Sequence, residues 1–90
     1  MTDRERAIRA YAAIHRAFLR RCHPTAWRAM INDCTIDQHC RRRAVEVFEA
    51  RQRLELELCQ QIADGERSAA DGDAVAIIAH EVAGAELRSL

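Results

Sequence analysis

Residues that break helices are rare in this chain, and their positions divide it into long segments. The 90 residues include a single proline, Pro24, and three glycines, the first of which is Gly65. Proline and glycine are the residues least compatible with a helix interior. The chain before Gly65 therefore has only one strong interruption, which predicts an all-α fold in which Pro24 and Gly65 mark helix ends.

The first segment has the pattern of an amphipathic helix over about residues 2–21. Thr2 can serve as its N-cap, with Glu5 at the third position in capping-box spacing. Apolar side chains and one histidine recur every three or four residues, which predicts a single core-facing side. These residues are Ile8, Tyr11, Ala12, His15, Phe18, Leu19 and Cys22. We interpret His15 as a core or boundary histidine with satisfied hydrogen bonds.

Arginines occupy the opposite side of the same helix. Arg6, Arg9, Arg16 and Arg20 share that side, and we predict that they form a partner-binding surface. Guanidinium groups recognise carboxylates and phosphates through paired hydrogen bonds.

Three further helices are expected. Pro24 suits the first turn of a short helix over about 25–31, with Trp27, Met30 and Ile31 facing inward. Thr35, with Gln38 three residues on, predicts the N-cap of a long helix over about 36–64 that stops at Gly65. Its apolar arc holds Ile36, Cys40, Ala44, Val47, Phe48, Leu54, Leu58, Cys59 and Ile62, widened by Val45, Leu56 and Ala63. Asp73 can cap a last helix ending near residue 88, whose inward residues would be Val75, Ile78, Ala79, Val82 and Ala85.

These segments predict one helical domain over residues 1–90, a compact irregular bundle of about four helices around one long central helix. A chain of this length builds a single core and leaves little room for a deep substrate cleft, so we expect no enzymatic activity. No stretch approaches the roughly 20 apolar residues that span a bilayer, so we expect no membrane association. We expect a cytoplasmic protein with reduced cysteines.

The charge of the chain is divided along its length. Residues 1–53 hold 12 arginines and 6 acidic residues, a net charge of +6, whereas residues 54–90 hold 2 arginines and 8 acidic residues, a net charge of −6. Such asymmetry indicates a charged partner, or one half folding back on the other. Either half could be the binding surface, and the chain could be a monomer or a homodimer.

A group of cysteines and histidines has the ligand types that zinc prefers, with Cys22, Cys34, His39 and Cys40 around the predicted turn. Their spacing fits no standard zinc finger, and we favour buried thiols, with no metal and no cofactor. Whether these four residues bind metal stays open. His39 and His80 fall on polar sides of their helices.

Two groups of charged residues on the long helix need partners. Arg51 lies in the middle of the apolar arc, where it must extend to solvent or pair with an acid such as Glu55 or Glu86. For the run from Arg41 to Arg43 we expect a solvated ladder, in which Arg42 pairs with Glu46 and Glu49 with Arg53.

These features favour a small protein-binding inhibitor or regulator that occupies a surface of a larger partner. All 14 basic residues are arginine, which is typical of GC-rich bacterial or phage genomes. The basic start DRERAIRAYAAIHRAFLRR, the lack of lysine and the lack of any catalytic motif together resemble the small inhibitors that phages carry against host defences, such as anti-CRISPR proteins. The resemblance implies a host nuclease or surveillance complex as the partner.

A small DNA-binding regulator that uses the basic half is the alternative function. The turn before the long helix permits a helix-turn-helix arrangement with Arg41 and Arg42 near the groove of DNA. That turn has no glycine and the helix after it is long, so nucleic-acid binding is possible but not favoured.

Overall fold

The computed structural model describes residues 1–65 and 74–89, which form α-helices and no strand. The helices are α1 (Asp3–Cys22), α2 (Pro24–Asn32), α3 (Ile36–Ala63) and α4 (Val75–Leu87). The prediction of an all-α fold with one long central helix is confirmed.

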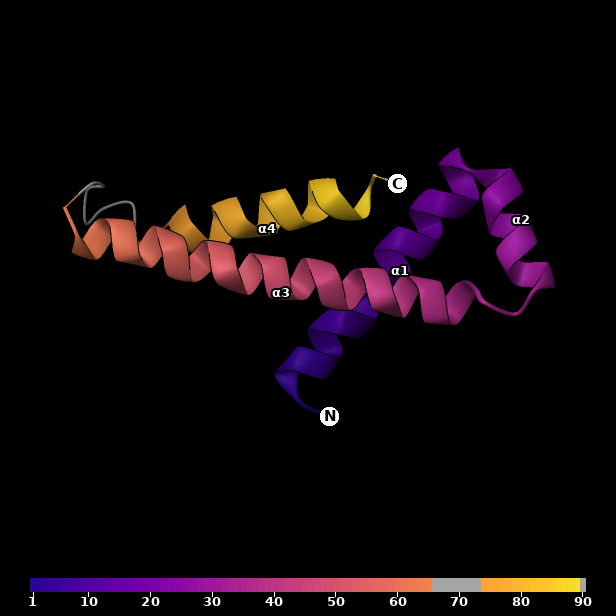
Figure 1. Cartoon of the computed structure of the whole chain (residues 1–90), viewed down its shortest axis with the longest axis horizontal. Helices are drawn as coiled ribbons and strands as arrows, with labels where there is room; N and C mark the ends of the chain where they lie inside the picture. Colours follow the sequence, from indigo (N-terminus) through magenta and orange to yellow (C-terminus); the bar gives the residue numbers. More distant parts are fainter. Residues whose placement is uncertain (66–73, 90) are drawn as a thin grey trace.

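The four helices form a flat bundle (Figure 1). The long helix α3 lies along the molecule, α4 runs antiparallel beside its C-terminal half, and α1 crosses behind it steeply and leads to α2. The Cα atoms extend over 52 × 28 × 14 Å, with a radius of gyration of 15.7 Å. A compact domain of this length would have a radius of gyration of about 12 Å. The bundle therefore exposes more surface than a rounded domain would.

Local signals explain most helix ends. The hydroxyl of Thr2 accepts a hydrogen bond of 3.1 Å from the backbone N–H of Glu5, as the capping spacing predicts. Pro24 begins α2 after a non-helical His23. Gly65 follows α3 with a φ of +78°, the left-handed conformation that glycine adopts at low cost. These three predictions are confirmed.

The turn between α2 and α3 differs from the prediction. The side chain of Thr35 makes no capping hydrogen bond. Its backbone N–H bonds instead to the carbonyl of Met30 at 2.9 Å, and that of Cys34 bonds to Ile31 at 3.2 Å. This is a Schellman C-cap of α2, in which Cys34, with a φ of 58°, stands where glycine is usual. The predicted cap at Asp73 lies outside the described residues.

The core lies where α1 and α4 pack on α3. Tyr11 from α1, Phe48 from α3 and Leu87 from α4 belong to one cluster, and Leu19, Ile36 and Cys40 form a second one. Most of the predicted α3 arc is buried or half-buried, but Leu56, Cys59 and Ala63 are exposed. In α1, Cys22 is exposed, and α2 buries no residue fully, with Ile31 exposed rather than inward. The predicted faces are therefore correct near the crossing of α1 and α3 and too wide beyond it.

The buried side of α4 was predicted only in part. Val75 and Ala79 are buried as expected, whereas Val82 and Ala85 are exposed. The buried positions are Val75, Ala79, Ala83 and Leu87, which recur every fourth residue. Such a line is an i, i+4 ridge set against the neighbouring helix. Because α4 is apolar on every side, its sequence pattern could not select this ridge.

Candidate functional site: a basic groove along α1

The four arginines predicted to bind a partner are all exposed on α1, and each has a neighbour within the protein. Arg6 lies 3.8 Å from Asp3, and Arg9 lies 3.7 Å from Glu5. These pairs are between neighbouring turns of a solvent-exposed helix, where ion pairs contribute about 0–1 kcal/mol. Both guanidinium groups can exchange such partners for those of a ligand.

The other two arginines contact the elements beside α1. Arg16 donates a hydrogen bond of 3.1 Å to Asp37 at the start of α3. The guanidinium of Arg20 lies over the indole of Trp27 in α2, 5.6 Å from the ring centroid. Arg16 and Arg20 are therefore held toward the two junctions that α1 makes with its neighbours.

Two hollows lie along this side of α1. One, of about 590 Å³, lies between α1 and α3, and the other, of about 520 Å³, lies between α1 and α2. They share Ala13 and Arg16, so they lie next to each other. We call the two hollows together the basic groove and define it by the lining residues Arg9, Ala13, Arg16, Arg20, Arg21, Trp27, Asp37, Cys40 and Arg41. Arg6 lines neither hollow.

Two carboxylates reduce the positive charge of the basic groove. Arg41 donates two hydrogen bonds to Glu5, at 2.6 and 3.0 Å. This pairing lowers the pKa of Glu5 and raises the pKa of Arg41. Asp37 engages Arg16, whereas Arg21 makes no ion pair with any described residue. The groove keeps a net positive charge, with Arg20 and Arg21 as the guanidinium groups not paired to an acid in the described part.

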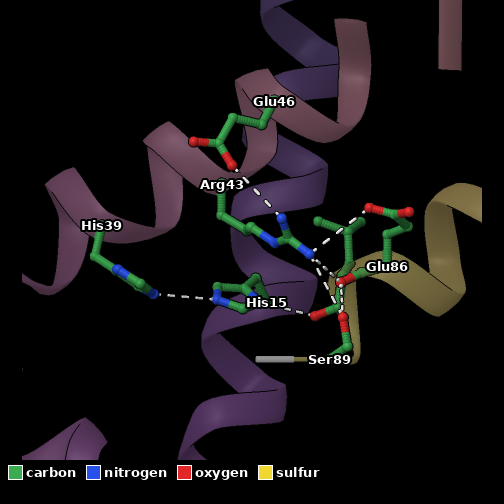
Figure 2. Close-up of polar contacts among 7 residues, drawn as sticks. His15, His39, Arg43, Glu46, Glu86 and Ser89 are labelled. Atoms are coloured by element: carbon green, nitrogen blue, oxygen red, sulfur yellow. Dashed lines mark hydrogen bonds and ion pairs between the residues drawn. The ribbon is translucent and has the colours of Figure 1, made fainter. Parts of the chain in front are cut away.

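A second polar cluster lies where α1, α3 and the end of α4 meet (Figure 2). His15 is fully buried, and its Nδ1 lies 2.8 Å from the carbonyl oxygen of Leu87. Its Nε2 lies 3.2 Å from Nε2 of His39. With Nδ1–H of His15 donating to Leu87, the N–H of His39 donates to the free Nε2 of His15. The interpretation of His15 as a satisfied core histidine agrees with this geometry.

His39 was predicted to lie on a polar side of its helix, and that prediction was wrong. It is half-buried, and burial, followed by the nearby charge of His15, lowers its pKa below the usual value. The reason is tertiary, because the last turns of α1 lie beside the start of α3. No spacing in the sequence indicates this contact.

Arg43 completes the cluster at the end of α4. Its Nη2 donates to the carbonyl oxygen of Glu86 at 3.1 Å and lies 3.4 Å from the hydroxyl of Ser89. It also pairs with Glu46 at 3.5 Å, whereas Glu49 pairs with Arg4 at 3.7 Å. The expected ladder is therefore not formed: Glu46 pairs with Arg43 within α3 instead of with Arg42, and Glu49 pairs with Arg4 of α1 instead of with Arg53. The His15 contact satisfies the carbonyl of Leu87 at the helix end, whereas the carbonyl of Glu86 also accepts hydrogen bonds from the backbone N–H and the hydroxyl of Ser89.

Arg51 finds one of its predicted partners and one that was not predicted. It lies 3.2 Å from Glu55 and donates a hydrogen bond of 2.6 Å to the hydroxyl of Tyr11. Its guanidinium also lies over the ring of Phe48, 5.0 Å from the centroid. Glu86, the other expected partner, pairs with Arg43 instead.

The predicted metal-ligand residues are distributed over different environments. Cys22 and Cys34 are exposed free thiols, Cys40 is a buried one, and His39 faces His15. Desolvation raises the pKa of Cys40. Within residues 1–65 and 74–89, no three of His, Cys, Asp and Glu come together to hold a metal ion. In the same part of the chain, no helix combines the length and the apolar character needed to cross a membrane.

Compared with protein-family models, curated proteins and solved structures, the chain matches none of them. The function has to be inferred from the basic groove itself.

Proposed function

We propose that this protein is a non-enzymatic inhibitor or regulator that binds an acidic segment of a larger protein in its basic groove. The observation that carries this proposal is that two adjoining hollows set arginines from α1 and α3 along one side of α1, with Trp27 lining the hollow next to α2. Three of the four arginines predicted to bind a partner, Arg9, Arg16 and Arg20, line it.

The dimensions of the basic groove suit a short extended peptide. Arg9 and Arg20 are separated by eleven residues of helix, or about 16 Å at 1.5 Å per residue. An extended chain covers that distance with about five residues at roughly 3.3 Å each. The small side chain of Ala13 lets a backbone approach closely, and each guanidinium can take a carboxylate through two hydrogen bonds. An acidic peptide of five residues or more is therefore the ligand that this geometry favours.

The chemistry of the groove supports binding rather than catalysis. Among the described residues that line the groove, the thiol is that of Cys40, which is buried with a raised pKa, so it stays protonated and is a poor nucleophile. The histidine pair lies outside the groove, where His15 bonds to the carbonyl of Leu87 in α4 and to His39. If the resemblance to phage-borne inhibitors holds, the partner is an acidic region of a host nuclease or surveillance complex.

DNA binding is the competing proposal, and two contacts speak against it. Arg41 is committed to Glu5 and Arg43 to the end of α4, so α3 has fewer free arginines than a recognition helix needs.

The test uses a triple substitution in the groove, Arg16→Gln, Arg20→Gln and Arg21→Gln. The matched control removes the same charge from three exposed arginines outside it, Arg28→Gln, Arg42→Gln and Arg53→Gln. Glutamine is preferred to glutamate because a reversal at Arg16 would place a carboxylate against Asp37. Both proteins should remain folded, since exposed substitutions usually change stability by no more than about 0.5 kcal/mol each.

Binding is measured by fluorescence anisotropy with a labelled hexaglutamate peptide and with a random-sequence DNA duplex. The groove variant should bind the peptide about tenfold more weakly, because three charge pairs of about 0.5 kcal/mol each correspond to that factor. The control should bind like the parent. If both variants lost the same affinity for the peptide, the assignment of peptide binding to the basic groove would be wrong. Duplex binding that falls by orders of magnitude between about 50 and 200 mM salt would support the DNA-binding alternative.

A further inference from the structure

A third hollow lies between the second half of α1 and the end of α4. Figure 1 shows the C-terminal end of α4 next to this part of α1, and the hydrogen bond between His15 and Leu87 joins the two helices there. The hollow has a volume of about 370 Å³, which is within the range of small-molecule sites. We call it the end pocket, and its lining residues are Ile14, Ala17, Phe18, Arg21, Cys22 and Arg88.

The inner wall of the end pocket is apolar and held in place by the core. Ile14 packs against one core cluster and Phe18 against the other, and both side chains are half-buried. The ring of Phe18 also contacts the rings of His15 and His23, at centroid distances of 6.1 and 5.2 Å. A wall fixed in this way offers an apolar ligand a preformed surface, which lowers the entropic cost of binding.

Two guanidinium groups and no carboxylate belong to the described residues that line the end pocket, since its charged members are Arg21 and Arg88. Neither arginine forms an ion pair with any residue in 1–65 or 74–89. Nη1 of Arg88 donates a hydrogen bond of 3.3 Å to the carbonyl of Gly84, which holds this guanidinium against α4. The end pocket therefore combines an apolar wall with a positive charge that no described acid balances.

We propose that the end pocket binds an amphipathic monocarboxylate, a molecule with one carboxylate on an apolar chain or ring. Its apolar part lies on Ile14 and Phe18, and its carboxylate accepts charge-assisted hydrogen bonds from Arg21 and Arg88. A medium-chain fatty acid and an aromatic acid share this chemistry. The end pocket borders the basic groove at Ala17 and Arg21, but the inference does not depend on peptide binding in that groove.

The test uses Cys22 as a reporter, because its exposed thiol lines the end pocket. The full chain reacts with iodoacetamide, an uncharged reagent, and peptide mass spectrometry follows the alkylation of each cysteine. Octanoate at about 10 mM should slow the alkylation of Cys22 about tenfold, because a ligand with ten non-hydrogen atoms is expected to have a Kd of about 1 mM. Cys34 and Cys59 are exposed thiols outside the end pocket and should react at unchanged rates. The buried Cys40 should stay protected, which shows that octanoate leaves the protein folded.

Parallel arms separate the parts of the proposal. Sodium acetate at the same concentration controls for ionic strength and should not protect Cys22. Octanoate and 2-naphthoate distinguish a chain from a ring, and protection by either acid supports the site. Octan-1-ol has the chain without the charge, so equal protection by octan-1-ol and octanoate would show that the two arginines do not select a carboxylate and would overturn the proposal.

A variant tests the arginine that the basic groove does not contain. Arg88→Gln should raise the Kd for octanoate about fivefold, through the loss of one charge-assisted hydrogen bond. The matched control is Arg53→Gln, because Arg53 is exposed on α3 and does not line the end pocket. Circular dichroism establishes that both variants are folded. The proposal is wrong if neither acid protects Cys22, if all three exposed thiols are protected equally, or if the two variants bind octanoate alike.

Discussion

Arg43 fastens the end of α4 to α3, and replacing it should destabilise the protein measurably. In Arg43→Met the side-chain stem and its packing are retained while the guanidinium is removed. The protein then lacks the hydrogen bond of 3.1 Å to the carbonyl of Glu86, the bond to Ser89 and the ion pairs with Glu46 and Glu86. Among the described residues, the end of α4 would then keep one side-chain hydrogen bond to another helix, that between His15 and Leu87.

The expected loss of unfolding free energy is about 2 kcal/mol. A hydrogen bond from a charged donor contributes about 1.5–3 kcal/mol, and a cation at a helix C-terminus adds about 0.3–1 kcal/mol. The ion pairs are largely solvated and contribute about 0–1 kcal/mol. Part of this is offset, because Nε of Arg43 is buried without a hydrogen-bond partner in the described structure, and the substitution removes it.

Arg42→Met is the matched control, since Arg42 is the exposed neighbour of Arg43 on the same helix. Urea unfolding followed by circular dichroism should show a change of no more than about 0.5 kcal/mol for this control. A loss of about 2 kcal/mol in Arg43→Met corresponds to a fall in Tm of roughly 8–16 °C for a domain of this size. Equal effects of the two substitutions would refute the role assigned to Arg43.

Two further predictions concern the core. Unfolding free energy should increase as the pH rises toward about 6.5 and level off above it, because burial lowers the pKa of His39 below its usual 6.5 and the unfolded chain therefore binds the proton more tightly. His39→Gln should reduce that increase in urea titrations at several pH values, and an identical pH profile in parent and variant would exclude this role. Phe48→Ala should cost about 3–5 kcal/mol, because its buried ring packs with Tyr11 and lies under the guanidinium groups of Arg4 and Arg51. A cost below about 1 kcal/mol in urea unfolding would contradict the assignment of Phe48 to the core.

The sequence predicts those features of the fold that depend on local chemistry. Some helix ends depend only on neighbours within one helical turn. The signals for them are Thr2 with Glu5, Pro24 and Gly65, and each marks the helix end that was expected. The strict apolar period of α1 identifies its buried side through Ile8 to Leu19. When polar residues fill one side of a helix, the period of 3.6 residues leaves only the opposite side to face the core.

Features set by the meeting of two helices were predicted less well. The apolar composition of α4 admits several buried sides, so the expectation of an inward Val82 and Ala85 was wrong, and packing chose Ala83 and Leu87. Thr35 has no capping role because Cys34 takes a left-handed conformation that closes α2 by backbone bonds alone.

In the candidate site, too, helical spacing predicts some residues, while the meeting of helices places others. The stripe of Arg9, Arg16 and Arg20 follows from the helical period, which places exposed arginines on one side of α1. Trp27 and Arg41 could not be assigned to the groove, because their positions depend on how α2 and α3 meet α1.

The hydrogen bond between His15 and the carbonyl of Leu87 has a consequence for the order of folding. The two residues are 72 positions apart, and closing a loop of that length costs about 4 kcal/mol of chain entropy by the logarithmic relation. Contacts between α1 and α2, and between α3 and α4, close much shorter loops and can form first. The joining of α4 to α1 is therefore a late event. Interactions that form after the transition state mainly slow unfolding rather than speed folding, so this hydrogen bond contributes chiefly to the lifetime of the native state.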